Sequence, residues 1–431
     1  MCRQFETKND KSWNDLFEKY DILQKIDTDG EFTISASKIK EFREPRLMTK
    51  FDHEINRPRV FSENDLSILP ISRGDYIISQ FTAYQPLVAL SDPIQQVALP
   101  EHLQSLNARA VTSETIAVNC ALASGIFSHF LGEEQLDATV SGRMGSGVFD
   151  FGIHNLRRGG VSSIRVDNAQ IEIDAAFEGI DSLALIEAKR DLSDDFIIRQ
   201  LYYPYRTWQE RVTKKVRPVF FVYSNGVYNL YEYEFQSTDE YNSLVLIKHA
   251  RYSIEEDMSI TLPELQRLAA DTSPVDEPKI PFPQADSFER VVNVCELLES
   301  QELDRDNITD GYAFDVRQTN YYTDAARYLG LVEKMKIDRT PAYRLSRQGR
   351  CVLKLNYKNR QLAFCKCILQ HRVFHKVFLL CCEHGEMPSR DTIVQIMKQS
   401  QLYKIESDST YYRRASTVSG WVNWMLKLVS E

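Results

Sequence analysis

The sequence predicts a multidomain α/β (α+β) protein in which a central mixed sheet is flanked by helices. The chain has 431 residues, which is too long for one ordinary core. Its hydrophobic content of 43% and charged content of 26% are those of a globular protein, and no apolar run is long enough to cross a bilayer. Between residues 102 and 250, strand patterns alternate with helical ones, which is typical of a mixed sheet covered by helices.

Residues 1–101 are expected to form a small N-terminal module that resembles a winged helix. The stretch "WNDLFEKYDILQKI" places apolar residues at helical spacing, and "LSILPISRGDYIISQF" predicts two short strands around a Gly-Asp turn. The irregular basic run between them could be a DNA-binding surface or a solvated loop. Its candidate contacts are Arg43, Arg46, Lys50, Arg57 and Arg59.

Residues 102–250 are expected to form the central domain. Ser113 fits the N-cap of a buried helix, and Pro204 is expected to kink a second one. "RPVFFVYSNGVYNLYEYEF" predicts two strands joined at Asn225-Gly226, the strongest short hairpin signal. The Gly-rich "SGRMGSGVFDFG" has no Gly-Lys-Ser/Thr, so we expect a tight turn near the site and no nucleotide cofactor.

The remaining residues are expected to form an acidic, proline-rich linker (251–285), a winged helix (286–360) and a second, largely helical winged helix (361–431).

From Arg317 to Lys376 the chain carries 14 Lys and Arg against 3 Asp and Glu, although the net charge of the whole chain is −9. Such a block indicates a localised polyanion site or, alternatively, a solvated basic face.

Within the first winged helix, the second helix is expected to enter the DNA major groove while a basic hairpin grips phosphate. A winged helix that binds another protein is the alternative. The expected helix contacts are Arg317, Gln318, Asn320, Tyr321 and Arg327, and the expected hairpin contacts are Arg344, Arg347 and Arg350.

The stretch "IEIDAAFEGIDSLALIEAKRD" places charged residues inside an apolar β-hairpin. Alternate side chains of a strand share a face, so Glu187 and Lys189 point the same way, and the "FEGIDS" turn brings Asp174 to them. Two neighbouring carboxylates repel unless a cation lies between them, and Mg²⁺ prefers such hard oxygen ligands. With an adjacent ammonium, this arrangement is suited to phosphodiester hydrolysis. Alternatively, these residues lie on the polar face of a half-buried strand.

This Asp, Glu-x-Lys pattern resembles the PD-(D/E)XK nuclease superfamily, and more closely the type II restriction endonucleases. The resemblance extends to "SGRMGSGVFDFGI", "IRQLYYPYRTWQ" and "PVFFVYSNGVYNLYEYEF", while "DVRQTNYYTDAARYLGLV" looks like an accessory winged-helix module of such enzymes. It implies a restriction-endonuclease-like core. The residues it assigns are Asp174 and Glu187 as Mg²⁺ ligands, Lys189 for the attacking water, Glu114 as an extra acid and Gln200 as a residue facing the site.

Two departures from the family pattern concern the first acid. Ile173 stands where the family has proline, and Glu172 competes with Asp174 for the role of metal ligand.

The resemblance also implies a function and partners. It predicts site-specific cleavage of double-stranded DNA that leaves 5′-phosphates, in a system with a cognate DNA methyltransferase. Because cutting both strands needs two active sites and each chain has one, a homodimer on a palindromic site is favoured, with a monomer that nicks sequentially and a tetramer as the alternatives. The alternatives are a non-catalytic winged-helix DNA-binding regulator and a repair or structure-specific nuclease.

The eight cysteines lack the spacing of a disulfide scaffold, so reduced thiols in a cytoplasm are expected. Several lie with histidines in "CKCILQHRVFHKVFLLCCEHG". We interpret these as buried residues of an apolar helix rather than as a zinc site, because Cys365 and Cys367 diverge on a helix.

Overall fold

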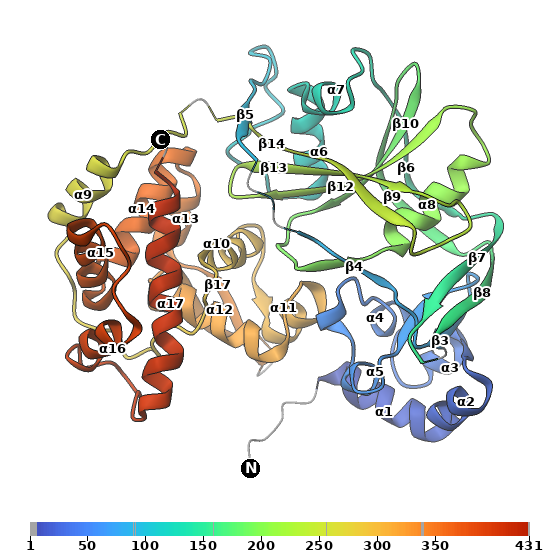
Figure 1. The fold of residues 1–431 in the computed structure, drawn as a ribbon, viewed down its shortest axis with the longest axis horizontal. Coiled ribbons are helices and arrows are strands. Elements are labelled where there is room, and N and C mark those ends of the chain that lie inside the picture. Colours follow the sequence, from blue (N-terminus) through green and yellow to red (C-terminus); the bar gives the residue numbers. More distant parts are fainter. Residues whose placement is uncertain are drawn as a thin grey trace.

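The computed structural model describes residues 7–88, 90, 92–157, 159–255, 257–337 and 340–429. The seven-stranded sheet lies above the N-terminal module, the larger C-terminal body lies to the left of both, and the three parts meet near the centre of the molecule (Figure 1). None of the helices in these ranges is long and apolar enough to cross a membrane.

The central sheet is mixed, which confirms the predicted α/β class. Its order is β5-β14-β13-β12-β10-β9-β6, with parallel pairing of β10 to β12 and of β14 to β5 and antiparallel pairing elsewhere. Because β5 is its edge strand, the sheet begins earlier in the chain than the predicted start at residue 102. The strands are β5 (Ile94–Gln96), β6 (Asp137–Gly145), β9 (Gln170–Glu178), β10 (Ser182–Lys189), β12 (Lys215–Ser224), β13 (Val227–Phe235) and β14 (Leu244–Ser253).

Helices cover both faces of this sheet. One face packs against α8 (Arg199–Gln209), which contains Pro204, and the other against α6 (Glu114–Ala123) and α7 (Ile126–Leu131). The sequence predicted one helix where α6 and α7 stand. They are separate because Gly125 adopts φ +75°, a left-handed conformation that interrupts the helix. Asn225 and Gly226 also have positive φ and join β12 to β13 as predicted.

The N-terminal module combines helices with a three-stranded sheet of order β1-β3-β2. A capping box between Thr7 and Asp10 starts its first helix. The basic run predicted to be irregular forms three short helical segments. The elements are α1 (Lys8–Tyr20), α2 (Ile22–Asp29), β1 (Phe32–Ser35), α3 (Ala36–Lys40), α4 (Pro45–Met48), η1 (Glu54–Asn56), α5 (Arg59–Ser62), β2 (Ser67–Pro70) and β3 (Asp75–Ser79).

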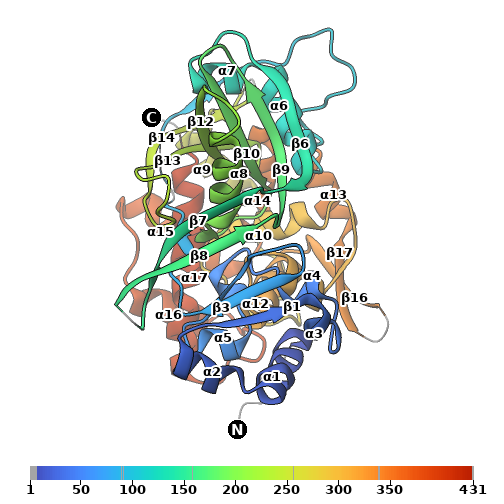
Figure 2. The same cartoon turned by 90° about the vertical axis from the view of Figure 1, so that its right-hand side faces the viewer.

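Two smaller strand pairs join the N-terminal module to the central domain. The hairpin of β7 (Val148–Asn155) and β8 (Gly160–Asp167) reaches from the sheet to this module (Figure 2), where Phe81 forms a bridge with Asn155. The second pair is β4 (Tyr84–Pro86) with β11 (Asp195–Ile197), which directly precedes α8.

The C-terminal body starts with a second three-stranded module, whose sheet order is β15-β17-β16. The elements are α10 (Phe288–Leu297), β15 (Leu303–Asp304), α11 (Arg305–Gly311), α12 (Val316–Tyr328), β16 (Val332–Ile337), β17 (Thr340–Leu345) and α13 (Arg347–Leu353).

The second predicted winged helix differs from the structure. The described residues of 361–431 contain no strand and continue instead as a helical bundle, which shares one core with the preceding module. Phe288 of α10 packs against Trp421 and Trp424, with ring centroids 5.1 and 4.2 Å away. The helices are α14 (Tyr357–Leu369), α15 (Arg372–His384), α16 (Arg390–Lys398) and α17 (Asp408–Lys427), and Cys365, Cys367 and Cys381 are buried in the bundle.

The predicted linker of 251–285 also differs. It contains α9 (Leu262–Asp271), which buries Leu265 and Ala269 against the bundle. A capping box between Thr261 and Glu264 starts this helix. The linker prediction rested on the acidic and proline-rich composition of the segment and did not take this local signal into account.

Candidate active site

The β9–β10 hairpin brings Asp174 beside the Glu-x-Lys strand. The antiparallel pairing of β9 with β10 runs to Ala175 opposite Ile186, and Asp174 and Glu187 are the next residues on the two strands. Beyond this point the Ala188 N–H of β10 donates to the side chain of Asp174, at 2.7 Å from Oδ2, instead of to a backbone carbonyl of β9.

A β-bulge on the other edge of β9 explains how Asp174 is oriented. Ala176 pairs with Val140 of β6, whereas Ile173 pairs with Gly142, so β9 carries one extra residue in this stretch. Such bulges interrupt the ladder and re-aim side chains. Consistent with this, Ile173 packs on the α8 face while Ala175 packs on the opposite face.

Glu187 lies at the centre of a buried polar cluster. Its Oε1 accepts hydrogen bonds from Lys189 Nζ and from Gln200 Nε2, both at 2.7 Å. The side chains of Glu187 and Lys189 are only 10% and 12% exposed. Gln200, on the first turn of α8, therefore contacts the site, and its Oε1 is buried without a protein partner.

Glu172, the rival first acid, points elsewhere. Its side chain is 58% exposed and lies 3.3 Å from Arg143 Nε of β6. Asp174 is therefore the carboxylate on β9 that contacts the Glu-x-Lys strand.

The site has more carboxylates than cations. Burial raises the pKa of Glu187 to about 8, and the nearby Asp174 adds to the shift. Burial also raises the pKa of Asp174 and brings that of Glu114 to about 6. Burial disfavours a charged Lys189, but the surrounding carboxylates, first Glu187 and then Asp52, raise its pKa well above the ordinary value. An additional cation would relieve this surplus of negative charge.

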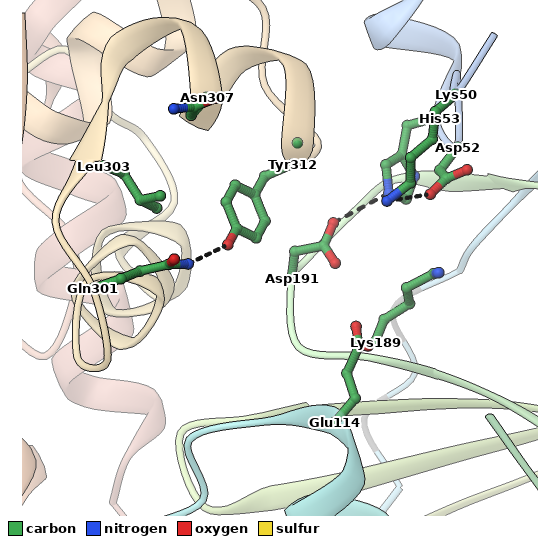
Figure 3. Close-up of a pocket in the computed structure, with 11 residues that line it drawn as sticks. Lys50, Asp52, His53, Glu114, Lys189, Asp191, Gln301, Leu303, Asn307 and Tyr312 are labelled. Carbon is green, nitrogen blue, oxygen red and sulfur yellow. Dashed lines mark hydrogen bonds and ion pairs between the residues drawn. The ribbon is translucent and has the colours of Figure 1, made fainter. Parts of the chain in front are cut away.

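A cleft of about 520 Å³ opens beside Lys189, and all three parts of the molecule contribute to it (Figure 3). Its lining is Lys50, Asp52 and His53 from the N-terminal module, Glu114, Lys189 and Asp191 from the central domain, and Gln301, Leu303, Asn307, Gly311 and Tyr312 from the C-terminal body.

His53 ties the N-terminal module to the loop that follows Lys189. Its side chain is 4% exposed, its Nε2 lies 3.1 Å from Asp191 Oδ2, and its Nδ1 lies 2.7 Å from the Asp195 carbonyl oxygen. Burial opposes protonation of the imidazole, but the hydrogen bonds to Asp191 and Asp195 outweigh it and raise the pKa of His53 to about 10. The charged imidazole in turn lowers the pKa of Asp191, against the effect of burial.

Two asparagines tie the C-terminal body to the same region. Asn293 of α10 donates to the Arg190 carbonyl at 2.7 Å and accepts from the Leu192 N–H at 3.1 Å. Asn56 of the N-terminal module donates to the Tyr312 carbonyl at 2.8 Å. The loop after Lys189 is thus held from both sides.

Sequence reasoning missed Asp52, His53 and Asp191. Asp191 stands two residues after Lys189, a spacing that could have indicated it. Asp52 and His53 lie in the basic run, whose arginines and lysines are the expected DNA contacts, and no sequence signal connects them to residues nearly 140 positions away.

The predicted N-terminal DNA contacts separate into different environments. Lys50 is 57% exposed and lines the cleft, and Arg46 on α4 is exposed. Arg43 donates to Asn9 Oδ1 at 2.5 Å. Arg57 is 10% exposed and bonded to Glu54 and to the Leu66 carbonyl, while Arg59 is 54% exposed and pairs with Glu63.

The predicted C-terminal contacts are not among the described residues that line the cleft. On α12, Arg317 is exposed, Tyr321 is half-buried, Asn320 donates to its own helix and Arg327 pairs with Asp324. The Oε1 of Gln318 is buried, so this side chain is turned partly inward.

The predicted hairpin contacts need a correction. Arg344 is on β17, where it pairs with Glu333, but Arg347 and Arg350 belong to α13. The hydroxyl of Ser346 accepts from the Gly349 N–H and starts that helix, which removes both arginines from the hairpin.

Comparison with protein families divides the chain at the same places as the structure. Residues 10–78, 79–253 and 290–430 match three family models, DUF6996, DUF6997 and DUF7226. Each is described as a domain of unknown function. The first match ends within β3 and the second ends with β14, so the N-terminal module and the central sheet match separate family models. No curated protein and no solved structure matches the chain.

Proposed function

We propose that the protein is a Mg²⁺-dependent, site-specific double-strand DNA endonuclease of the restriction type. In this proposal the central sheet is a restriction-endonuclease-like core, and cleavage leaves 5′-phosphates. The observation that carries it is the hydrogen bond from the Ala188 N–H to Asp174, which joins the first acid to the Glu-x-Lys strand. Lys189 and Gln200 both bond to Glu187, and Glu114 is close enough to Asp174 for that carboxylate to raise its pKa.

The residues present fit a magnesium ion. No group of three or more His, Cys, Asp or Glu side chains within the described ranges is arranged to hold a metal, but Mg²⁺ typically takes only one or two carboxylates plus waters and substrate phosphate. Asp174 and Glu187 would supply these carboxylates, and a bound cation would oppose the burial and the Asp174 charge that raise the pKa of Glu187 to about 8. When bound, the ion would lower the pKa of a water and stabilise charge on the phosphate.

Lys189 is proposed to orient the attacking water or contact the scissile phosphate. Its ammonium is held by Glu187 at 2.7 Å, so it is fixed on the side of the strand that faces the acids. Gln200 donates to the same oxygen and holds the Glu187 carboxylate in place.

The flanking modules are proposed to bind DNA as winged helices. The C-terminal one has the order helix, strand, helix, helix, strand, strand, and its exposed Arg317 starts the helix that would enter the major groove. A cytoplasmic homodimer, acting beside a cognate DNA methyltransferase, would cut both strands of a symmetric site.

Cleavage of unmethylated phage DNA tests the proposal. Wild-type protein with Mg²⁺ is expected to yield discrete fragments, and EDTA is expected to abolish them. Lys189→Ala and Asp174→Ala are expected to reduce the rate by at least roughly 10²–10³-fold, since each removes a group that acts at the reacting phosphate. Glu172→Ala is the matched control and should cleave normally, because Glu172 pairs with Arg143 outside the site.

The other outcomes identify the alternatives. Fragments without reproducible ends, or preference for branched DNA, would favour a repair or structure-specific nuclease. DNA binding without any cleavage would favour a non-catalytic regulator.

A further inference from the structure

The cleft beside Lys189 has two chemically different sides. The residues from the N-terminal module and the central domain are all charged or, in the case of His53, paired with a carboxylate. The residues from the C-terminal body are all uncharged and come from one short segment, 301–312. Figure 3 shows Tyr312, Gln301 and Asn307 across the cleft from Asp191 and Lys189.

The size of the cleft limits what can enter it. Its volume of about 520 Å³ lies within the range of pockets that hold small ligands, roughly 300–1,000 Å³, which is the scale of one nucleotide.

The uncharged side carries the groups that recognise a nucleobase. Tyr312 offers an aromatic ring, and its backbone is fixed because its carbonyl accepts from Asn56. Leu303 adds a buried apolar surface, and Gln301 offers a side-chain amide, which pairs with base edges. The Asn307 amide nitrogen donates to Asp304 at 2.9 Å, so Asn307 offers its amide oxygen as an acceptor. The Gln301 amide lies 3.5 Å from the Tyr312 hydroxyl, so both point into the same space.

Building on the proposed nuclease function, we propose that the cleft receives one nucleotide whose base has left the helical stack. Its phosphate lies on the charged side beside Lys189, and its base stacks on Tyr312. A nucleotide has the same division as the cleft, a charged phosphate and an uncharged aromatic base. Enzymes that extrude a nucleotide hold it by stacking on aromatic side chains and by hydrogen bonds to the base edge.

Gly311 allows the cleft to be filled without disturbing the fold. It is the last residue of α11 and lines the cleft, and a Cβ added to it meets no atom within 4 Å. Gly311→Val therefore places a side chain in open space. Gly74→Val is the matched control for the preference between the two duplexes, because Gly74 also has no atom within 4 Å of an added Cβ but lies in the β2–β3 turn outside the cleft lining. Any loss of DNA affinity that it causes in the N-terminal module applies to both duplexes alike.

The test is the binding of two DNA duplexes in EDTA, followed by fluorescence anisotropy. One duplex is perfectly paired, and the other carries a single-nucleotide bulge, whose base is already unstacked. We expect wild type and Gly74→Val to bind the bulged duplex roughly 10-fold more tightly and Gly311→Val to lose this preference. Tyr312→Ala should lose most of it, because base stacking on an aromatic ring is worth roughly 10- to 100-fold. Tyr312→Phe should keep it.

Equal binding of the two duplexes by wild type, or a preference that survives in Gly311→Val, would overturn the inference. Because binding is measured without Mg²⁺, this result is independent of cleavage. Cleavage of phage DNA without the bulge preference would support the nuclease function and contradict the nucleotide pocket. A bulge preference without cleavage would support the pocket and contradict the nuclease function.

Discussion

The two modules that flank the central sheet share a strand order but contact the cleft through different chemistry. In both, the third strand lies between the first and the second, as β1-β3-β2 and as β15-β17-β16. The N-terminal module brings Lys50, Asp52 and His53, whereas the C-terminal body brings only uncharged groups. A common topology therefore does not determine which chemical groups a module places in the cleft. These depend on a few side chains in one segment.

The same difference applies to how each module holds the loop after Lys189. The N-terminal contact is a buried ion pair between His53 and Asp191, and the C-terminal contact is the neutral amide of Asn293. We therefore expect the first contact to depend on pH and the second not to.

The largest effect is expected from removing the charged contact. His53→Ala leaves Asp191, whose side chain is 9% exposed, without its buried partner. Breaking a buried pair in this way costs about 3–5 kcal/mol of unfolding free energy, which urea denaturation measures. Arg59→Ala is the control, because it removes an exposed pair with Glu63 and should change stability little. Equal losses in the two variants would contradict the buried role of His53.

The pH dependence of stability should show the same contact. The pKa of His53 is about 10 in the folded protein against an ordinary 6.5, so folding takes up a proton between these values. Its stabilisation is complete below pH 6.5 and is lost as the pH rises through 10. The raised pKa of Glu187, about 8, also makes the unfolding free energy fall as the pH rises, but this fall occurs mainly below pH 8.

Between pH 8 and 10 the buried thiols of Cys295 and Cys365, whose pKa burial raises, add a loss of the same sign, so the contribution of His53 is measured as the difference between wild type and a His53 variant. In this range, unfolding free energy should fall by roughly 2–3 kcal/mol more in wild type than in His53→Gln. Parallel pH profiles for the two proteins would show that the imidazole is neutral.

The neutral contact is expected to have a smaller, pH-independent effect. Asn293 is fully buried, and Asn293→Ala leaves the Arg190 carbonyl and the Leu192 N–H without their partner. The expected loss is about 1–2 kcal/mol, measured by urea denaturation at pH 7 and pH 9. A loss that changed with pH would remove the distinction between the two contacts.

The smallest effect concerns DNA binding by the N-terminal module. Lys50 and Arg59 are similarly exposed, at 57% and 54%, but only Lys50 of this pair lines the cleft. If Lys50 contacts a phosphate, Lys50→Ala should make the slope of log K against log salt less negative by about 1. Arg59→Ala should leave the slope unchanged, and the reverse result would move the DNA surface away from the cleft.

Local patterns in the sequence were sufficient for the hairpin and its triplet. Strand alternation places Glu187 and Lys189 on one face, and a short turn necessarily returns Asp174 to them. The Ser113 cap and the Asn225-Gly226 turn were equally predictable, because each depends on residues that are close in sequence.

Tertiary structure decided the rest. The bulge that orients Asp174 exists only against β6, and His53 meets Asp191 only because two separate modules pack together. The second predicted winged helix is a bundle because Phe288 and the tryptophans of α17 share one core. Periodicity reports which face of a segment is buried, but the partner that buries it is set by packing between distant parts of the chain.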